Sequence, residues 1–120
     1  NAFNVAAVHI VGKRRWNRRG AMVTDRYQHV EHVPEPAGLL DLGLPIVGID
    51  NVEGSVPLEG AVLPEACVLV FGQEGPGLSP ESLALCEQVL HITQYGSTRS
   101  MNAGAAAAIA MWAWALQWAR

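Results

Sequence analysis

The sequence has few of the features that mark secreted, metal-binding or membrane-spanning proteins. Its two cysteines, Cys67 and Cys86, stand far apart and lack CxxC spacing, so neither a disulfide framework nor a zinc site is indicated. The apolar stretch at the start comes before its positive charges and lacks a typical cleavage site, which argues against a secretory signal. We therefore expect a protein of the reducing cytoplasm, with no resident metal.

Charge is sparse, and its distribution matters more than its sum. Asp and Glu outnumber Lys and Arg by 11 to 8, which by itself argues against a nucleic-acid partner. No acid precedes Asp25, however, and six basic residues fall in one segment: Lys13, Arg14, Arg15, Arg18, Arg19 and Arg26. With Trp16 among them, these cations suit phosphate contacts and stacking on an unpaired base. RNA binding is expected from Arg14, Arg15, Trp16, Arg18 and Arg19, although a loop that only contacts water remains open.

Short apolar runs alternate along the chain with segments of helical character. A chain of 120 residues, half of them hydrophobic, is long enough for one compact domain. The expected strands are residues 5–11, 30–33, 46–49, 67–71 and 89–93. The expected helices are 19–27, 36–42, 79–88 and 100–119, and a loop rich in Gly, Pro and Glu fills residues 50–66. This alternation predicts an α/β fold with a parallel sheet that helices cover on both faces.

The segment 101–117 carries no charge. It is mostly Ala and Gly and falls short of the ~20 residues of a membrane span, so a buried helix is the better interpretation. Two apolar stripes run along it: Ile109, Trp112 and Leu116 form one, and Ala107, Met111, Trp114 and Trp118 form the other. A helix that is apolar on two sides must be covered on both. We expect one stripe to pack on the sheet, and the other, with Trp114 and Trp118, to contact a second copy of the chain.

The strongest functional signal is the segment 71–79, FGQEGPGLS, placed between a buried strand and the start of a helix. In a parallel sheet this position is the carboxyl edge, where ligands bind. Gly75-Pro76-Gly77 suits a type II turn with a positive φ at Gly77, and glycines let a ligand approach the backbone closely. An ordinary glycine-rich connection remains the alternative, because such loops are common.

A second signal is the segment 92–108, ITQYGSTRSMNAGAAAA. A strand ends here, a loop rich in hydroxyl groups follows, and Ser100 and Asn102 stand at the start of a helix whose first turns are almost all small. Backbone N–H groups at a helix start are free to bind a ligand. Taken alone, Ser100 is equally well explained as an N-cap and the alanines as helix formers.

Together the two segments resemble motifs 2 and 3 of the SpoU family of SPOUT methyltransferases. The pattern Gly-x-Glu-Gly-x-Gly-Leu is followed by an acidic helix, a strand end and a Ser-Leu-Asn-like opening of an alanine-rich helix. The matching residues are Gly72, Glu74, Gly75, Gly77, Leu78, Ile92, Ser100 and Asn102. The sequence departs from the pattern at Thr93 and Gln94, where the family usually has Pro and Met, and at Met101, where it has Leu.

The resemblance implies an α/β fold with a C-terminal trefoil knot and S-adenosyl-L-methionine as the cofactor. It also implies methyl transfer to a ribose 2′-hydroxyl of tRNA or rRNA by a cytoplasmic homodimer whose final helix lies at the interface. The expected cofactor-binding residues are Gly72, Gly75, Ile92 and Met101. Catalytic roles in orienting the cofactor and the ribose are expected of Glu74, Ser100 and Asn102.

The resemblance covers residues 1–120 as a fold, but the family's motif 1 has no convincing counterpart. Residues 1–5 look like the tail of that motif, whose Asn and Arg would precede Asn1. We therefore expect the domain without its first strand and motif 1 helix. A catalytically impaired SpoU-like protein that binds RNA or dimerises is the alternative. A nucleotide-binding module is less favoured, because no Walker lysine follows the glycines.

Overall fold

The computed structural model describes residues 8–11, 30–72, 76–96 and 103–119. The chain divides into two compact units, residues 1–41 and 42–120. In the first unit, strand β1 (Val8–Val11) pairs in parallel with β2 (Val30–Val33), and Val8 lies opposite Val30. The 3-10 helix η3 (Pro36–Leu42) follows. These elements agree with the predicted strands and the predicted helical turns, whereas the helix expected over residues 19–27 lies outside the described residues.

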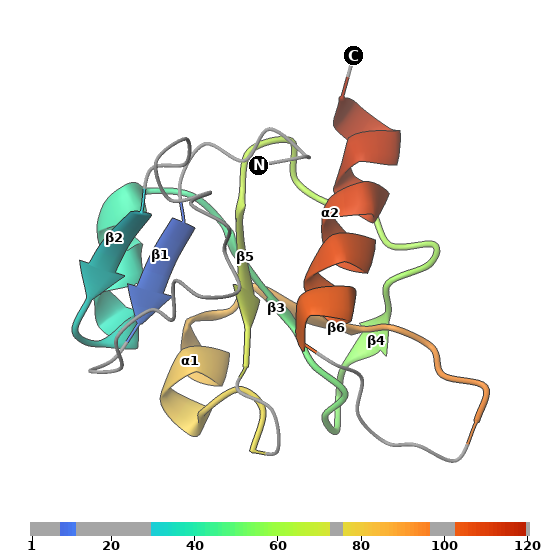
Figure 1. The fold of residues 1–120 in the computed structure, drawn as a ribbon, viewed down its shortest axis with the longest axis horizontal. Helices are drawn as coiled ribbons and strands as arrows, with labels where there is room; N and C mark the ends of the chain where they lie inside the picture. The colour runs from blue at the N-terminus through green and yellow to red at the C-terminus, as the bar shows by residue number, and fades with distance from the viewer. Residues whose placement is uncertain (1–7, 12–29, 73–75, 97–102, 120) are drawn as a thin grey trace. The chain divides into compact units, whose positions relative to one another are not determined.

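The second unit is built on a parallel sheet, seen in Figure 1. Its strands are β3 (Ile46–Ile49), β4 (Val56–Pro57), β5 (Val68–Phe71) and β6 (Gln88–His91), in the order β4-β6-β3-β5. Each neighbouring pair is parallel, so the carboxyl ends of all four strands lie at one edge. In a sheet of this kind, that edge is where ligands bind.

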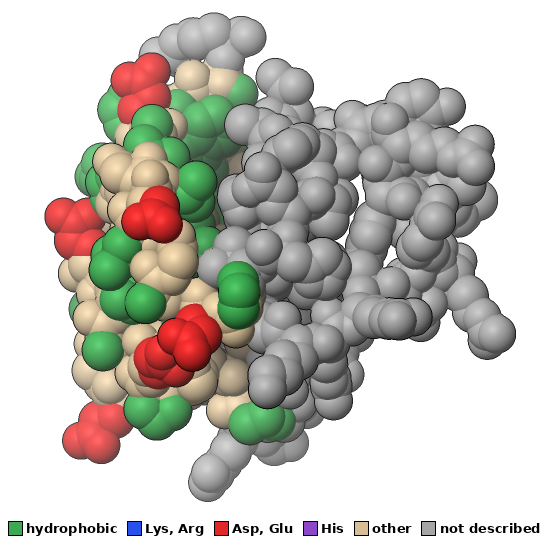
Figure 2. Space-filling view, turned by 90° about the vertical axis from the view of Figure 1, so that its left-hand side faces the viewer, with side chains coloured by type: hydrophobic (Ala, Val, Ile, Leu, Met, Phe, Trp, Pro, Cys, Tyr) green, Lys and Arg blue, Asp and Glu red, His purple; other side chains and the backbone are tan. Residues whose placement is uncertain are grey.

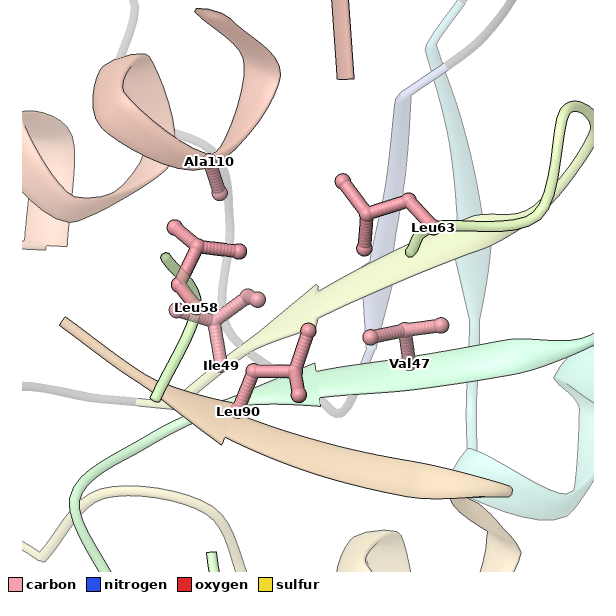
Figure 3. Packing of buried hydrophobic residues seen from close by; sticks show 6 residues of the cluster. All are labelled: Val47, Ile49, Leu58, Leu63, Leu90 and Ala110. Atoms are coloured by element: carbon pink, nitrogen blue, oxygen red, sulfur yellow. The ribbon is translucent and has the colours of Figure 1, made fainter. Parts of the chain in front are cut away.

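Two helices pack on opposite faces of this sheet, and the alternation of side chains along β3 shows which face each covers. Val47 and Ile49 point to the face that carries α2 (Ala103–Trp118), where they join Ala110 in the core (Figure 3). Gly48 points to the face of α1 (Pro80–Leu85), where an added Cβ would lie 2.8 Å from Cys86 Sγ. Glycine at 48 thus lets α1 approach the sheet, and the predicted parallel sheet with helices on both faces is confirmed.

Helix α1 begins as the sequence predicts but ends earlier. The hydroxyl of Ser79 accepts a hydrogen bond from Ser82 N–H, with Pro80 in the first turn. The helix was expected to reach residue 88, yet Cys86 is already extended. The reason is that the backbone N–H of Glu87 donates to the carbonyl of Ile46 at 2.7 Å. The chain has therefore already joined β3 there, and β6 begins at Gln88 rather than at residue 89.

Strand β4 lies within the segment that was predicted to be a loop. It has only two residues, both exposed, and one of them is Pro57. Proline is tolerated because β4 is an edge strand. The next residue, Leu58, donates its N–H to the carbonyl of His91 at 2.8 Å, which extends the contact with β6. In the described ranges, no helix is long and apolar enough to cross a membrane.

Candidate functional site

The two segments singled out in the sequence emerge at the same edge of the sheet. Gly72 follows the end of β5, and Ile92 follows the end of β6, with β3 between these two strands. Phe71 and Ile92 are both half-buried against the hydrophobic core. The fold therefore brings together at one edge two loops that are about twenty residues apart in the sequence, as a ligand site at the carboxyl edge requires.

Gly72 is required by the path of its own loop. A Cβ at this position would lie 2.6 Å from Gly77 Cα, and nearer still to the Gly77 carbonyl carbon and the Leu78 nitrogen. The loop thus returns directly over the end of β5. Gly77 has a φ of +72°, which confirms the positive φ predicted for it, and a Cβ there would lie 2.6 Å from Asp50 Oδ2. These two glycines shape the loop by allowing backbone and side chain to pack at distances that no other residue permits.

Asp50 holds this loop in place, although no motif in the sequence pointed to it. It follows directly after β3, and its Oδ2 accepts the N–H of Leu78 at 3.0 Å. Its Oδ1 accepts the N–H of Asn51 at 2.9 Å, while its own N–H donates to the carbonyl of Leu90 at 3.0 Å. Asp50 therefore links the ends of β3 and β6 to the glycine loop. An acid placed immediately after a buried strand, at the ligand edge, is the signal that could have revealed it.

A second group of polar contacts lies where β4 and β6 end. The hydroxyl of Ser55 donates to the carbonyl of Val52 at 2.6 Å, so it is the acceptor in its 2.9 Å contact with Nδ1 of His91. Close by, hydrogen bonds from Thr93 hold the pKa of Glu59 below its ordinary value. The largest cause is the bond from the Thr93 side chain, and the Glu59 and Thr93 backbones and the charge of His91 add to it. Sequence reasoning missed these residues because residues 50–66 were assigned to a connecting loop.

The final helix is tied to the same 55–65 region by side-chain hydrogen bonds. The indole N–H of Trp114 donates to the carbonyl of Glu65 at 2.9 Å, and that of Trp118 donates to the carbonyl of Leu63 at 2.7 Å. The Gln117 amide accepts from Leu63 N–H at 2.8 Å and donates to Ala61 O at 3.1 Å. These bonds correct the prediction that Trp114 and Trp118 face a partner, because both indoles are half-buried within their own chain.

The outward face of α2 is the other predicted stripe. Ile109 is 39% exposed, Trp112 56% and Leu116 66%. The spacing of these three residues, three and then four, is the 3.5-residue repeat of helices that pack along a common seam. The stripe carries no charge along the described length of the helix.

The remaining predicted site residues fall outside the described part of the chain. Gly72 and Ile92 are described and lie at the same edge. Residues outside are Arg14, Arg15, Trp16, Arg18, Arg19, Glu74, Gly75, Ser100, Met101 and Asn102. All eight Lys and Arg are likewise outside the described ranges, and the face drawn in Figure 2 shows acidic side chains scattered among apolar ones. Any basic RNA contact must therefore come from residues that the structure does not describe.

The cysteines show no sign of reactive chemistry. Burial raises the pKa of both thiols, Cys67 and Cys86, above the ordinary value, so both are protonated near neutral pH. Cys86 also donates its S–H to the carbonyl of Ser82 at 3.3 Å. Among the residues that the structure describes, no cluster of three His, Cys, Asp or Glu is arranged to hold a metal ion.

A glycine-shaped loop and the segment after Ile92 thus both lie at the carboxyl edge of a parallel sheet, which is the position where α/β domains of this kind bind ligands. Residues 1–112 match the SpoU rRNA Methylase family. The chain therefore belongs to that family, which confirms the membership that its two motifs predict.

Known structures and proteins agree with this assignment. The chain is similar to the TrmH/SpoU tRNA modifying enzyme of A. aeolicus, with a TM-score of 0.84 and 25% identity over 97% of this chain and 63% of that one. It shares its fold with the SpoU methyltransferase AviRb of Streptomyces viridochromogenes in complex with the cofactor AdoMet, at a TM-score of 0.83 and 24% identity over 97% of this chain and 49% of that one. An uncharacterised tRNA/rRNA methyltransferase of Mycobacterium avium (strain 104) is 35% identical over 71 residues. That match covers 59% of this chain but only 23% of the mycobacterial protein.

Proposed function

We propose that this chain is the methyltransferase domain of an RNA 2′-O-methyltransferase that uses S-adenosyl-L-methionine and acts on tRNA or rRNA. The observation that carries the proposal is that Gly72, after β5, and Ile92, after β6, lie at the same edge of the sheet. Membership of the SpoU family and the AdoMet complex of AviRb support the choice of cofactor. The ribose hydroxyl and the class of RNA follow from the resemblance of the two motifs.

The described part of the edge fits this cofactor in its chemistry. Phe71 and Ile92 offer half-buried apolar side chains of the kind that contact a nucleoside base. Gly72 and Gly77 let the loop pack closely on its own backbone and on the Asp50 side chain at this edge. The carboxylate of Asp50, at this same edge, is occupied by the N–H groups of Leu78 and Asn51. Gly72, Gly75, Ile92 and Met101 are the residues that we expect to hold the cofactor.

The reaction sets clear requirements for the chain. When bound, adenosylmethionine supplies a methyl group activated by the adjacent sulfonium. The protein has to align a ribose 2′-oxygen with that methyl carbon, exclude water, and accept the hydroxyl proton as the new C–O bond forms and the S–C bond breaks. We assign the orienting roles to Glu74, Ser100 and Asn102. Glu74 follows the end of β5 by three residues, and Ser100 and Asn102 directly precede α2.

We further propose that the domain is knotted at its C-terminal end and forms a homodimer through α2. The exposed stripe of Ile109, Trp112 and Leu116 supports the dimer, because large apolar side chains repeated at heptad spacing favour burial against a second helix. The occupant that we propose is a second copy of this chain. In the same dimer, Arg14, Arg15, Trp16, Arg18 and Arg19 supply the RNA contacts, since basic and aromatic side chains suit phosphates and unpaired bases.

One experiment tests the core of this proposal. Calorimetric titration of the folded chain with adenosylhomocysteine should show saturable binding of one ligand per chain. Incubation with methyl-labelled adenosylmethionine and total tRNA or rRNA, followed by digestion to nucleosides, then identifies the methylated atom. A folded chain that takes up no ligand contradicts the proposed cofactor, and label on a base rather than on ribose contradicts the proposed 2′-hydroxyl.

A further inference from the structure

The loop after β6 departs from the motif pattern at its second residue. Thr93 stands where the motif resemblance predicts proline. Proline fixes φ and has no N–H, so it needs no hydrogen-bond partner. Threonine restricts the backbone less and brings two donors, its N–H and its hydroxyl. A chain with Thr93 therefore needs another means to hold this loop.

Glu59 supplies the acceptors for both donors. Its carboxylate is hydrogen-bonded by the side chain and by the backbone of Thr93, and the lowered pKa of Glu59 reflects these bonds. The register of β4 and β6 brings the two residues together. Pro57 lies opposite His91, and Leu58 N–H donates to His91 O at 2.8 Å. Glu59 and Thr93 are each two residues further along parallel segments.

The same region holds the chain beyond the loop as well. Ser55 contacts His91 just before the loop begins, and residues 61–65 accept or donate four side-chain hydrogen bonds with α2. The 55–65 segment thus contacts both the end of β6, next to Ile92, and α2. Ile92 is the predicted cofactor-binding residue of the second motif that the structure describes.

We propose that Glu59 is a positioning residue that holds the loop 92–96 through Thr93 and so keeps the adjacent Ile92 in place for the cofactor. This role rests on the proposed function, because it concerns the same cofactor. A carboxylate suits it better than an amide, since two oxygens can accept from both donors of Thr93 at once, whereas glutamine has only one acceptor oxygen. The side chain is exposed and needs no contact with the ligand itself.

The test compares Glu59→Gln with Glu53→Gln, a matched change of an exposed acid in the segment between β3 and β4. Glu59→Gln should raise the dissociation constant for adenosylhomocysteine by about three- to tenfold, the size of a lost charged hydrogen bond at an exposed site. It should also speed hydrogen exchange at the Thr93 amide, measured by NMR without ligand. Glu53→Gln should change neither quantity.

A second background separates positioning from a general loss of structure. Thr93→Pro removes both donors and fixes φ, so Glu59→Gln should have no further effect on binding in that background. Thr93→Val alone should behave like a milder form of Glu59→Gln, because it removes only the hydroxyl.

Each outcome decides something. Unchanged Thr93 exchange in Glu59→Gln overturns the hydrogen-bonded clamp. Faster exchange with unchanged ligand binding overturns the positioning role and leaves the proposed function intact. A wild-type chain that binds no adenosylhomocysteine overturns both, while the amide measurement still reports on the clamp. If Glu59→Gln weakens adenosylhomocysteine binding equally in the wild-type and Thr93→Pro backgrounds, Glu59 does not act through Thr93, and the inference is overturned.

Discussion

The backbone N–H of Leu78 donates a hydrogen bond to Oδ2 of Asp50, 3.0 Å away, and thereby ties the glycine loop to the end of β3. Removing this acceptor leaves the N–H of Leu78 without a hydrogen-bond partner, in a residue whose side chain is buried. Asp50→Ala should therefore lower the free energy of unfolding by about 1–3 kcal/mol. Chemical denaturation measures this change, and Glu53→Ala is the control. Equal stability of the two variants would contradict a supporting role for Asp50.

Gly72 should tolerate no side chain, whereas Gly96 should. A Cβ at 72 meets the backbone of Gly77 and Leu78, while nothing lies within 4 Å of one at 96. Gly72→Ala should therefore cost about 1–3 kcal/mol, as overpacking does, and weaken adenosylhomocysteine binding. Gly96→Ala should leave the melting temperature nearly unchanged. Thermal unfolding of both variants provides the comparison, and a stable Gly72→Ala protein would show that the loop follows another path.

The two faces of α2 should respond differently to charge. Leu116→Glu places a carboxylate on the exposed stripe and should shift the chain from dimer to monomer in sedimentation without loss of folding. Trp118→Glu removes an indole that donates to Leu63 O and should instead lower stability. Val62→Glu is the control, since Val62 is 77% exposed but lies outside the stripe. A wild-type chain that sediments as a monomer at all concentrations refutes the dimer.

The basic segment should determine the salt dependence of RNA binding. Replacing Arg14, Arg15, Arg18 and Arg19 by Ala should weaken binding and reduce the slope of log K against log salt by about one unit for each lost phosphate contact. Filter binding over a range of salt concentrations gives the slope. If the slope does not change, these residues contact water rather than RNA.

Glu59 should make stability depend on pH in the acid range. Its pKa in the folded chain is lowered from 4.5, so its stabilising contribution is fully present above that value and is lost as the pH falls through the folded-state pKa. His91 is the charged group that faces it from β6. Below pH 4.5, the melting temperature of the wild type should fall more steeply than that of Glu59→Gln. If the melting temperatures of the two proteins fall in parallel as the pH is lowered, the hydrogen bonds of Glu59 do not make stability depend on pH.

The sequence predicted those parts of the structure that depend on local patterns. The apolar runs at 30–33 and 46–49 became β2 and β3 with the expected bounds, and the Ser79-Pro80 start of α1 was read correctly from its capping chemistry. The edge position of Gly72 and Ile92 followed from the parallel sheet, because strands of one direction end together.

What the sequence did not predict depends on contacts between distant residues. Strand β4 is too short and exposed to carry a hydrophobic pattern, and it is a strand only because β6 pairs with it. Trp114 and Trp118 belong to a stripe that looks as apolar as the outward one. Their hydrogen bonds to the carbonyls of Glu65 and Leu63, together with those of Gln117, determine which stripe faces inward. The partners of Asp50 and Glu59 are likewise contributed by other strands and loops.

The hydrogen bonds between α2 and residues 61–65 join positions that are 49 to 56 residues apart in the chain. Contacts of such long range form late in folding, because the entropy of closing the intervening loop is lost before they contribute. The contacts between α2 and residues 61–65 therefore form only when the last helix docks. A ligand that binds at the carboxyl edge of the sheet would select the fully folded chain and stabilise it in proportion to the logarithm of its concentration. Ligand-dependent melting thus reports on the docking of α2 as well as on the occupancy of the site.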